Sequence, residues 1–172
     1  HPVAHSFPTR RSSDLGFPHV NEPDIGAFEN GSVTPLLVEL KVFLEGAYDT
    51  TPHEMRDNLK VPIRSPYPQD PRTIPGVPDD IVDWVLVELK PGLALPPATS
   101  KSALLHKDGR IVADDGSSGI IEMTAPPGLY YIVIRQRNHL DIESAAAHAF
   151  NTSTSTLYDF TVDGAAPYDK FL

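Results

Sequence analysis

The chain has 172 residues, a formal net charge of −9 and no cysteine. The missing cysteines exclude disulfides and thiolate metal sites, and the acidic surface argues against nucleic acid as a partner. The length allows one ordinary domain with short extra segments. Eighteen prolines favour strands joined by stiff loops over long helices. No apolar stretch approaches the roughly 20 residues that a membrane-spanning helix needs.

Residues 1–15 differ in character from the rest of the chain. The run HSFPTRRSSDL at residues 5–15 resembles the in-frame translation of a widely used short-read sequencing adapter. The alternative is a natural disordered polar arm. Because eleven consecutive residues match, we interpret residues 1–15 as an artefact of sequencing and expect them to be disordered. Without Arg10, Arg11 and Asp14 the net charge changes from −9 to −10, so the chain stays acidic.

Residues 16–32 are expected to form a terminal stub and a linker. Within them, DIGAFE at residues 24–29 resembles the closing motif of right-handed parallel β-helix proteins on bacterial surfaces. The resemblance implies a β-helix on the N-terminal side, and the alternative is a short edge strand of the following domain. Because one rung of a solenoid cannot bury its own apolar face, we expect this segment to be weakly held.

A single domain is predicted over residues 33–165, followed by a truncated tail at residues 166–172. Its first strand is marked by apolar Val38, Leu40, Val42 and Leu44 alternating with mostly polar residues. Residues 79–90 are almost continuously apolar, which indicates a central strand covered on both faces. Further strands are predicted at residues 101–106, 110–113, 120–124, 129–135 and 157–162. About seven short strands with turns between them predict an all-β, Greek-key β-sandwich of the prealbumin or immunoglobulin type.

Two segments are harder to assign. Residues 50–78 hold seven prolines, which disfavours a helix or a central strand, although a helical turn fits residues 53–56. Leu59, Ile63 and Tyr67 suggest that this long loop packs against the sandwich. Residues 141–150 fit a helix through their three alanines, whereas their neighbours favour a strand.

The candidate metal ligands are Asp108, Asp114 and Asp115, which lie on adjacent predicted turns. Carboxylates suit calcium, but the spacing of an EF-hand loop is absent, and aspartate next to glycine is also a common turn sequence. We therefore expect no cofactor, with calcium as the alternative. The chain has no nucleophile elbow and no phosphate-binding glycine loop, so no enzyme activity is expected of it.

The candidate ligand-binding residues are Arg135, Arg137, Tyr67 and Trp84. Arg135 and Arg137 end a predicted core strand on one face and could grip a carboxylate or an acidic sugar. The alternative is that they pair with local acids such as Asp141 and Glu143. Trp84 is either a core anchor or a platform for a sugar ring, and burial would favour the anchor.

Several runs together resemble a β-sandwich module found near the C-terminus of large secreted bacterial surface proteins, often before a dockerin-like or sorting tail. The resemblance covers about three quarters of the chain, with one departure at Gln136, where the group often has histidine. Residues 119–133 are also similar to a run in transthyretin-like and pilin-B-type sandwiches. The matching runs are VELKVFLEG at 38–46, VPIRSPY at 61–67, DWVLVEL at 83–89, DGRIV at 108–112, GLYYIVIR at 128–135, RNHL at 137–140 and YDFT at 158–161.

This resemblance implies an extracellular or cell-surface location and, as partners, other domains of the same parent chain. We therefore expect a non-catalytic accessory or structural module. One alternative is a carbohydrate- or calcium-binding module with extracellular polysaccharide as its partner. Another is a fragment of a polysaccharide-degrading enzyme whose active site lies in the missing part.

Overall fold

The computed structural model of the chain describes residues 34–162, which belong to the second of two compact units, residues 33–172. The expectations for residues 1–15, 16–32 and 166–172 lie outside the described residues. Residues 34–162 form eleven strands and no helix, so the fold is all-β, as the sequence predicts. Within the same residues, no helix is long and apolar enough to cross a membrane.

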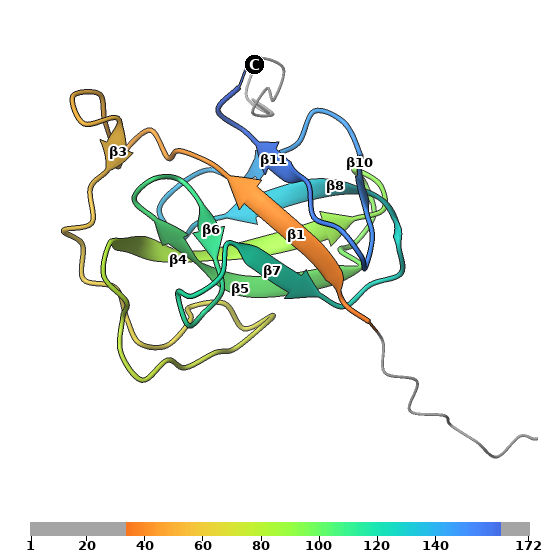
Figure 1. The fold of residues 1–172 in the computed structure, drawn as a ribbon, viewed down its shortest axis with the longest axis horizontal. Helices are drawn as coiled ribbons and strands as arrows, with labels where there is room; N and C mark the ends of the chain where they lie inside the picture. Colours follow the sequence, from red (N-terminus) through yellow and green to blue (C-terminus); the bar gives the residue numbers. More distant parts are fainter. Residues whose placement is uncertain (1–33, 163–172) are drawn as a thin grey trace, which may run out of the picture. The chain divides into compact units, whose positions relative to one another are not determined.

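Two sheets make up the domain. The smaller has the order β11-β1-β7, and the larger has the order β10-β8-β4-β5-β6, with β9 also paired to β8. Figure 1 shows β1 and β7 lying across the strands of the larger sheet. The smaller sheet comprises β1 (Leu36–Lys41), β7 (Ile120–Met123) and β11 (Leu157–Asp159). The larger comprises β4 (Ile81–Lys90), β5 (Thr99–His106), β6 (Ile111–Val112), β8 (Gly128–Arg135), β9 (Ile142–Glu143) and β10 (His148–Phe150), and β2 (Tyr48–Asp49) pairs with β3 (Glu54–Met55) in a separate hairpin.

The core lies between the two sheets. Along β1, Leu36, Val38 and Leu40 are buried, and the residues between them are partly exposed. This alternation follows from the pleat of a strand, which turns successive side chains to opposite faces. Side chains of β1 and β7 join those of β4, β5 and β8 in one apolar cluster, as in a β-sandwich.

Strand β4 is buried on both faces, as its nearly continuous apolar sequence predicts. Its side chains Val85, Val87 and Leu89 face the core of the sandwich. Trp84 belongs to a second apolar cluster, to which a proline-rich loop (residues 56–80) contributes. This loop therefore covers the outer face of the larger sheet. Its contributing residues are Val61, Tyr67, Ile74 and Val77.

The seven predicted strands correspond to β1, β4, β5, β6, β7, β8 and β11. The helical turn expected at residues 53–56 is wrong, because Glu54 and Met55 pair with β2 instead. Residues 141–150 contain strands β9 and β10. The predicted packing of the long loop through Leu59 and Ile63 is also wrong, since these side chains are 52% and 54% exposed.

The backbone conformation of the turn between β5 and β6 requires a glycine at position 109. Its φ is +90°, and an added Cβ would lie 2.9 Å from Cε1 of Phe43 and 3.0 Å from the carbonyl oxygen of Val42. We expect Gly109→Ala to lower the free energy of unfolding by about 1–3 kcal/mol in urea titrations. Gly46→Ala is the matched control, because nothing lies within 4 Å of an added Cβ there. Equal effects of the two substitutions would contradict this explanation.

Candidate functional site

Trp84 is an anchor of the fold. The side chain is fully buried in the second apolar cluster. Its indole Nε1 donates a hydrogen bond of 2.7 Å to the carbonyl oxygen of Pro62 in the proline-rich loop. A buried indole normally finds such an acceptor. Trp84 is therefore buried rather than exposed as a platform for a sugar ring, which favours its interpretation as a core anchor.

Tyr67 is half-buried and also holds the loop to the sheet. Its hydroxyl lies 3.2 Å from the carbonyl oxygen of Trp84 on β4 and 3.0 Å from that of Arg135 on β8, and its single hydrogen is shared between these two acceptors. Burial, followed by the nearby charge of Asp83, raises the pKa of the Tyr67 hydroxyl to about 12. The hydroxyl thus stays protonated and keeps donating across the physiological range.

The two candidate arginines pair with acids of the neighbouring strand. Arg135 Nε lies 3.0 Å from Oε2 of Glu88, and its Nη1 lies 3.4 Å from Oδ2 of Asp141. Arg137 Nε donates to Oδ2 of Asp83 at 2.9 Å. Glu88 and Asp83 are both buried within β4. The arginines therefore neutralise acids of their own chain.

Of the two local acids named in the sequence analysis, Asp141 does pair with Arg135, which favours ion pairing over ligand binding for this arginine. Glu143 instead lies 3.7 Å from Nζ of Lys90. The main partners come from β4, which is about 50 residues away in sequence but adjacent to β8 in the sheet. Spacing along the chain could not indicate them.

Asp70 connects the proline-rich loop to β5. Its Oδ2 accepts a hydrogen bond of 2.7 Å from the backbone N–H of Ser102 and another of 2.7 Å from Nε of Arg72. Its carbonyl oxygen accepts from the Ser102 hydroxyl at 2.6 Å. Burial raises the pKa of the Asp70 carboxyl group, but the hydrogen bonds from Arg72 and Ser102 outweigh it, so the pKa falls below 3.8.

The lowered pKa of Asp70 predicts how the stability of the fold changes at acid pH. A carboxyl group with a lower pKa in the folded chain stabilises the fold above its unfolded pKa, and this contribution is lost as pH falls through the folded pKa. We expect Asp70→Asn to lower the free energy of unfolding at neutral pH by about 1–2 kcal/mol.

The same substitution should also flatten the loss of stability as the pH falls through and below 3.8, the ordinary pKa of an aspartate carboxyl group. Urea titrations at a series of pH values measure both effects. Asp57→Asn is the control, because Asp57 is exposed and has no ion pair within 4.0 Å among residues 34–162. An acid dependence identical to that of the unaltered chain would contradict the prediction for Asp70.

The three candidate calcium ligands do not come together. Asp108 Oδ1 lies 2.8 Å from Nδ1 of His106, Asp114 Oδ2 accepts from Arg72 at 2.7 Å, and Asp115 Oδ1 accepts the N–H of Ser117 at 2.9 Å. Over residues 34–162, no three histidine or acidic side chains are grouped as a metal ion would need. Each aspartate has a partner of its own instead, and Asp115 closes a turn with its side chain.

A pocket of about 310 Å³ opens beside the Asp83 end of β4. Val82 and Asp83 both line it, although consecutive strand residues normally face opposite sides. The explanation is an irregularity in the pairing of β4 with β5 between Ile81 and Asp83, because a bulge redirects side chains. The preceding Asp80 has φ +63°, which is unusual for a residue other than glycine.

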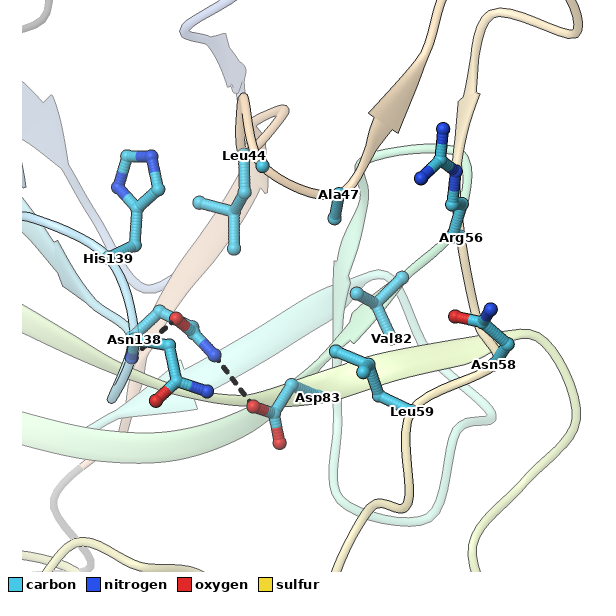
Figure 2. A pocket seen from close by; sticks show the side chains of 11 residues that line it. Leu44, Ala47, Arg56, Asn58, Leu59, Val82, Asp83, Asn138 and His139 are labelled. Atoms are coloured by element: carbon cyan, nitrogen blue, oxygen red, sulfur yellow. Dashed lines mark hydrogen bonds between the residues drawn. The ribbon is translucent and has the colours of Figure 1, made fainter.

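Four chain segments, near residues 44, 58, 83 and 138, surround this pocket (Figure 2). Leu44, Leu59 and Val82 converge on its centre, with Arg56 and Asn58 on one side and Asn138 and His139 on the other. The Asp83 side chain is fully buried, and its Oδ2 accepts from Nε2 of Gln136 at 2.6 Å as well as from Arg137. Its Oδ1 is buried and has no hydrogen-bond partner among residues 34–162.

Sequence reasoning singled out the polar run after β8 but missed Asp83, Asn58 and the pocket. One signal for Asp83 was present, because it is, like Glu88, an acid inside a largely apolar strand. Such a residue needs a partner from elsewhere in the fold.

Comparison of the chain with protein-family models, with curated proteins and with solved structures finds no significant match.

Proposed function

We propose that residues 34–162 act as a non-catalytic structural module of a secreted or cell-surface bacterial protein. The observation that carries the proposal is that the candidate ligand-binding residues form contacts within the fold itself. Arg135, Arg137 and Tyr67 all bind groups of their own chain, and Trp84 is buried. These contacts brace the proline-rich loop and the strand ends.

The bracing favours a stiff spacer or cap. The loop is tied to the sheet at three separate points, through Pro62, Tyr67 and Asp70. Proline restricts the backbone of the loop further, which lowers the entropy that the loop loses on folding. Such bracing would let the module act as a stiff body between neighbouring domains of a parent chain.

An activity assay on the full 172-residue chain tests the non-catalytic part of the proposal. The chain is incubated with pectin, xylan, cellulose and chitin, and both reducing ends and unsaturated products are measured against heat-unfolded chain. We expect no difference between the two samples. Product formed by the folded chain alone would overturn the proposal in favour of a polysaccharide-degrading enzyme.

The context of the module is tested at the source locus by long-read sequencing of DNA without ligated adapters. We expect one reading frame from a β-helix through residues 24–29 into this domain, without the run at residues 5–15. A frame that carries residues 5–15, or that joins the sandwich directly to a catalytic domain, would overturn the proposed context.

A further inference from the structure

We propose that the pocket beside Asp83 binds one neutral sugar unit. This inference is independent of the spacer role, because a structural module can also hold a ligand at one end. The pocket shares Asp83 and Gln136 with the polar contacts described above, but its other lining residues take no part in them.

The size and the apolar part of the pocket fit a single ring. A volume of about 310 Å³ is at the small end of the range for ligand sites. Leu59 supplies most of the apolar surface for the C–H groups of a ring, because Leu44 and Val82 are only 4% and 2% exposed (Figure 2). Leu59 is 52% exposed, and a ligand placed against it would cover this apolar surface.

The polar side chains of the pocket are suited to bind the hydroxyl groups of a sugar. Asn58 and Asn138 line the pocket from opposite sides. Within the described part of the chain, neither amide side chain forms a hydrogen bond that a ligand would have to displace. Each amide offers a donor and an acceptor, and a hydroxyl needs both. This combination would recognise a ring whose hydroxyl groups are spaced around an apolar face.

Asp83 adds a reason for a donor in the ligand. Its Oδ1 is buried without a partner among residues 34–162, so a ligand hydroxyl would reach this acceptor only after a rotation of the Asp83 side chain. The bulge and the left-handed Asp80 place this residue at the pocket wall. Local irregularities of this kind recur where a side chain is aimed at a ligand.

The charges around the pocket favour a neutral ligand. Asp83 is paired with Arg137 at 2.9 Å, and Arg56 at the rim lies 3.6 Å from Asp49. These two pairs sum to zero formal charge. An anion would meet Asp83, and a cation would meet Arg56, so neither is favoured over an uncharged polyol.

The test uses the full chain labelled with ¹⁵N and titrated with glucose, galactose, mannose, xylose and N-acetylglucosamine. We expect at least one sugar to cause saturable shifts of the side-chain amide signals of Asn58, Asn138 and Gln136. Asn58→Ala and Asn138→Ala are each expected to raise Kd by about tenfold. Gln69→Ala is the matched control, because Gln69 is an exposed amide on the proline-rich loop that does not line the pocket.

Both asparagines are exposed, so their alanine variants should fold, and the dispersion of the spectra checks this. Absence of saturable shifts with every sugar, or shifts confined to other surfaces, would overturn the inference. Glucuronate and glucosamine are titrated in parallel. Tighter binding of either one than of the best neutral sugar would overturn the assignment to an uncharged ligand.

Discussion

Trp84→Ala is expected to lower the free energy of unfolding by about 3–5 kcal/mol. The side chain is fully buried between β4 and the proline-rich loop, where it joins the second apolar cluster. Its removal leaves a cavity and also leaves the carbonyl oxygen of Pro62 without its donor. Because small domains have only about 5–15 kcal/mol of stability, this one change takes a large fraction of it. Urea titration followed by circular dichroism measures the loss.

Trp84→Phe separates packing from hydrogen bonding and serves if the alanine variant does not fold. Phenylalanine fills most of the space but cannot donate to Pro62, so a loss of about 1–2 kcal/mol is expected. Leu140→Ala is the control, because this leucine is 66% exposed and should change stability by less than about 0.5 kcal/mol. Trp84→Ala with an effect no larger than the control would show that the tryptophan is not an anchor.

Arg137→Met is expected to cost about 2–3 kcal/mol, although the arginine side chain is 37% exposed. The reason lies in its partner, because Asp83 is fully buried and would keep only the hydrogen bond from Gln136. Loss of one member of a buried pair costs more than the pair itself contributes. Arg64→Met is the matched control, since Arg64 is exposed and has no ion pair in the part of the chain that the structure describes.

A double-mutant cycle decides whether this cost comes from Asp83. Asp83→Asn keeps the shape of the side chain and removes its charge, so Arg137→Met should cost at least about 1 kcal/mol less in that background. The free energies of unfolding of the two single variants, the double variant and the unaltered chain provide the coupling. Strict additivity would mean that the arginine acts through some other contact.

The strands were predictable from the sequence because their pattern is local. The alternation that includes Val38 and Leu40 marks β1, although this strand ends at Lys41, before Val42 and Leu44. The apolar run at residues 79–90 marks a strand covered on both faces. Both patterns follow from the two-residue period of a strand and need no knowledge of its neighbours. The turn at Gly109 was predictable for the same reason, because the required positive φ is a property of one residue.

The long loop was predictable in part. Its prolines excluded a helix, and Tyr67 packs down on the sheet as expected. Leu59 and Ile63 do not, because which side chains of an irregular segment face inward depends on where its backbone is tied. Those ties run from Pro62, Tyr67 and Asp70 to strands β4, β5 and β8. No repeating pattern of residues along the sequence indicates these contacts.

By itself, the sequence determined the class of fold, the central strand, the turns and the acidic character of this protein, since each depends on composition or on neighbours along the chain. The tertiary structure alone decided the partners of Arg135 and Arg137, the separation of Asp108, Asp114 and Asp115, and the pocket at Asp83. Its walls come from segments near residues 44, 58, 83 and 138, which meet only when the sheets form. Buried polar groups form hydrogen bonds with whichever donors or acceptors the fold brings close. Separation along the chain does not predict which groups these are.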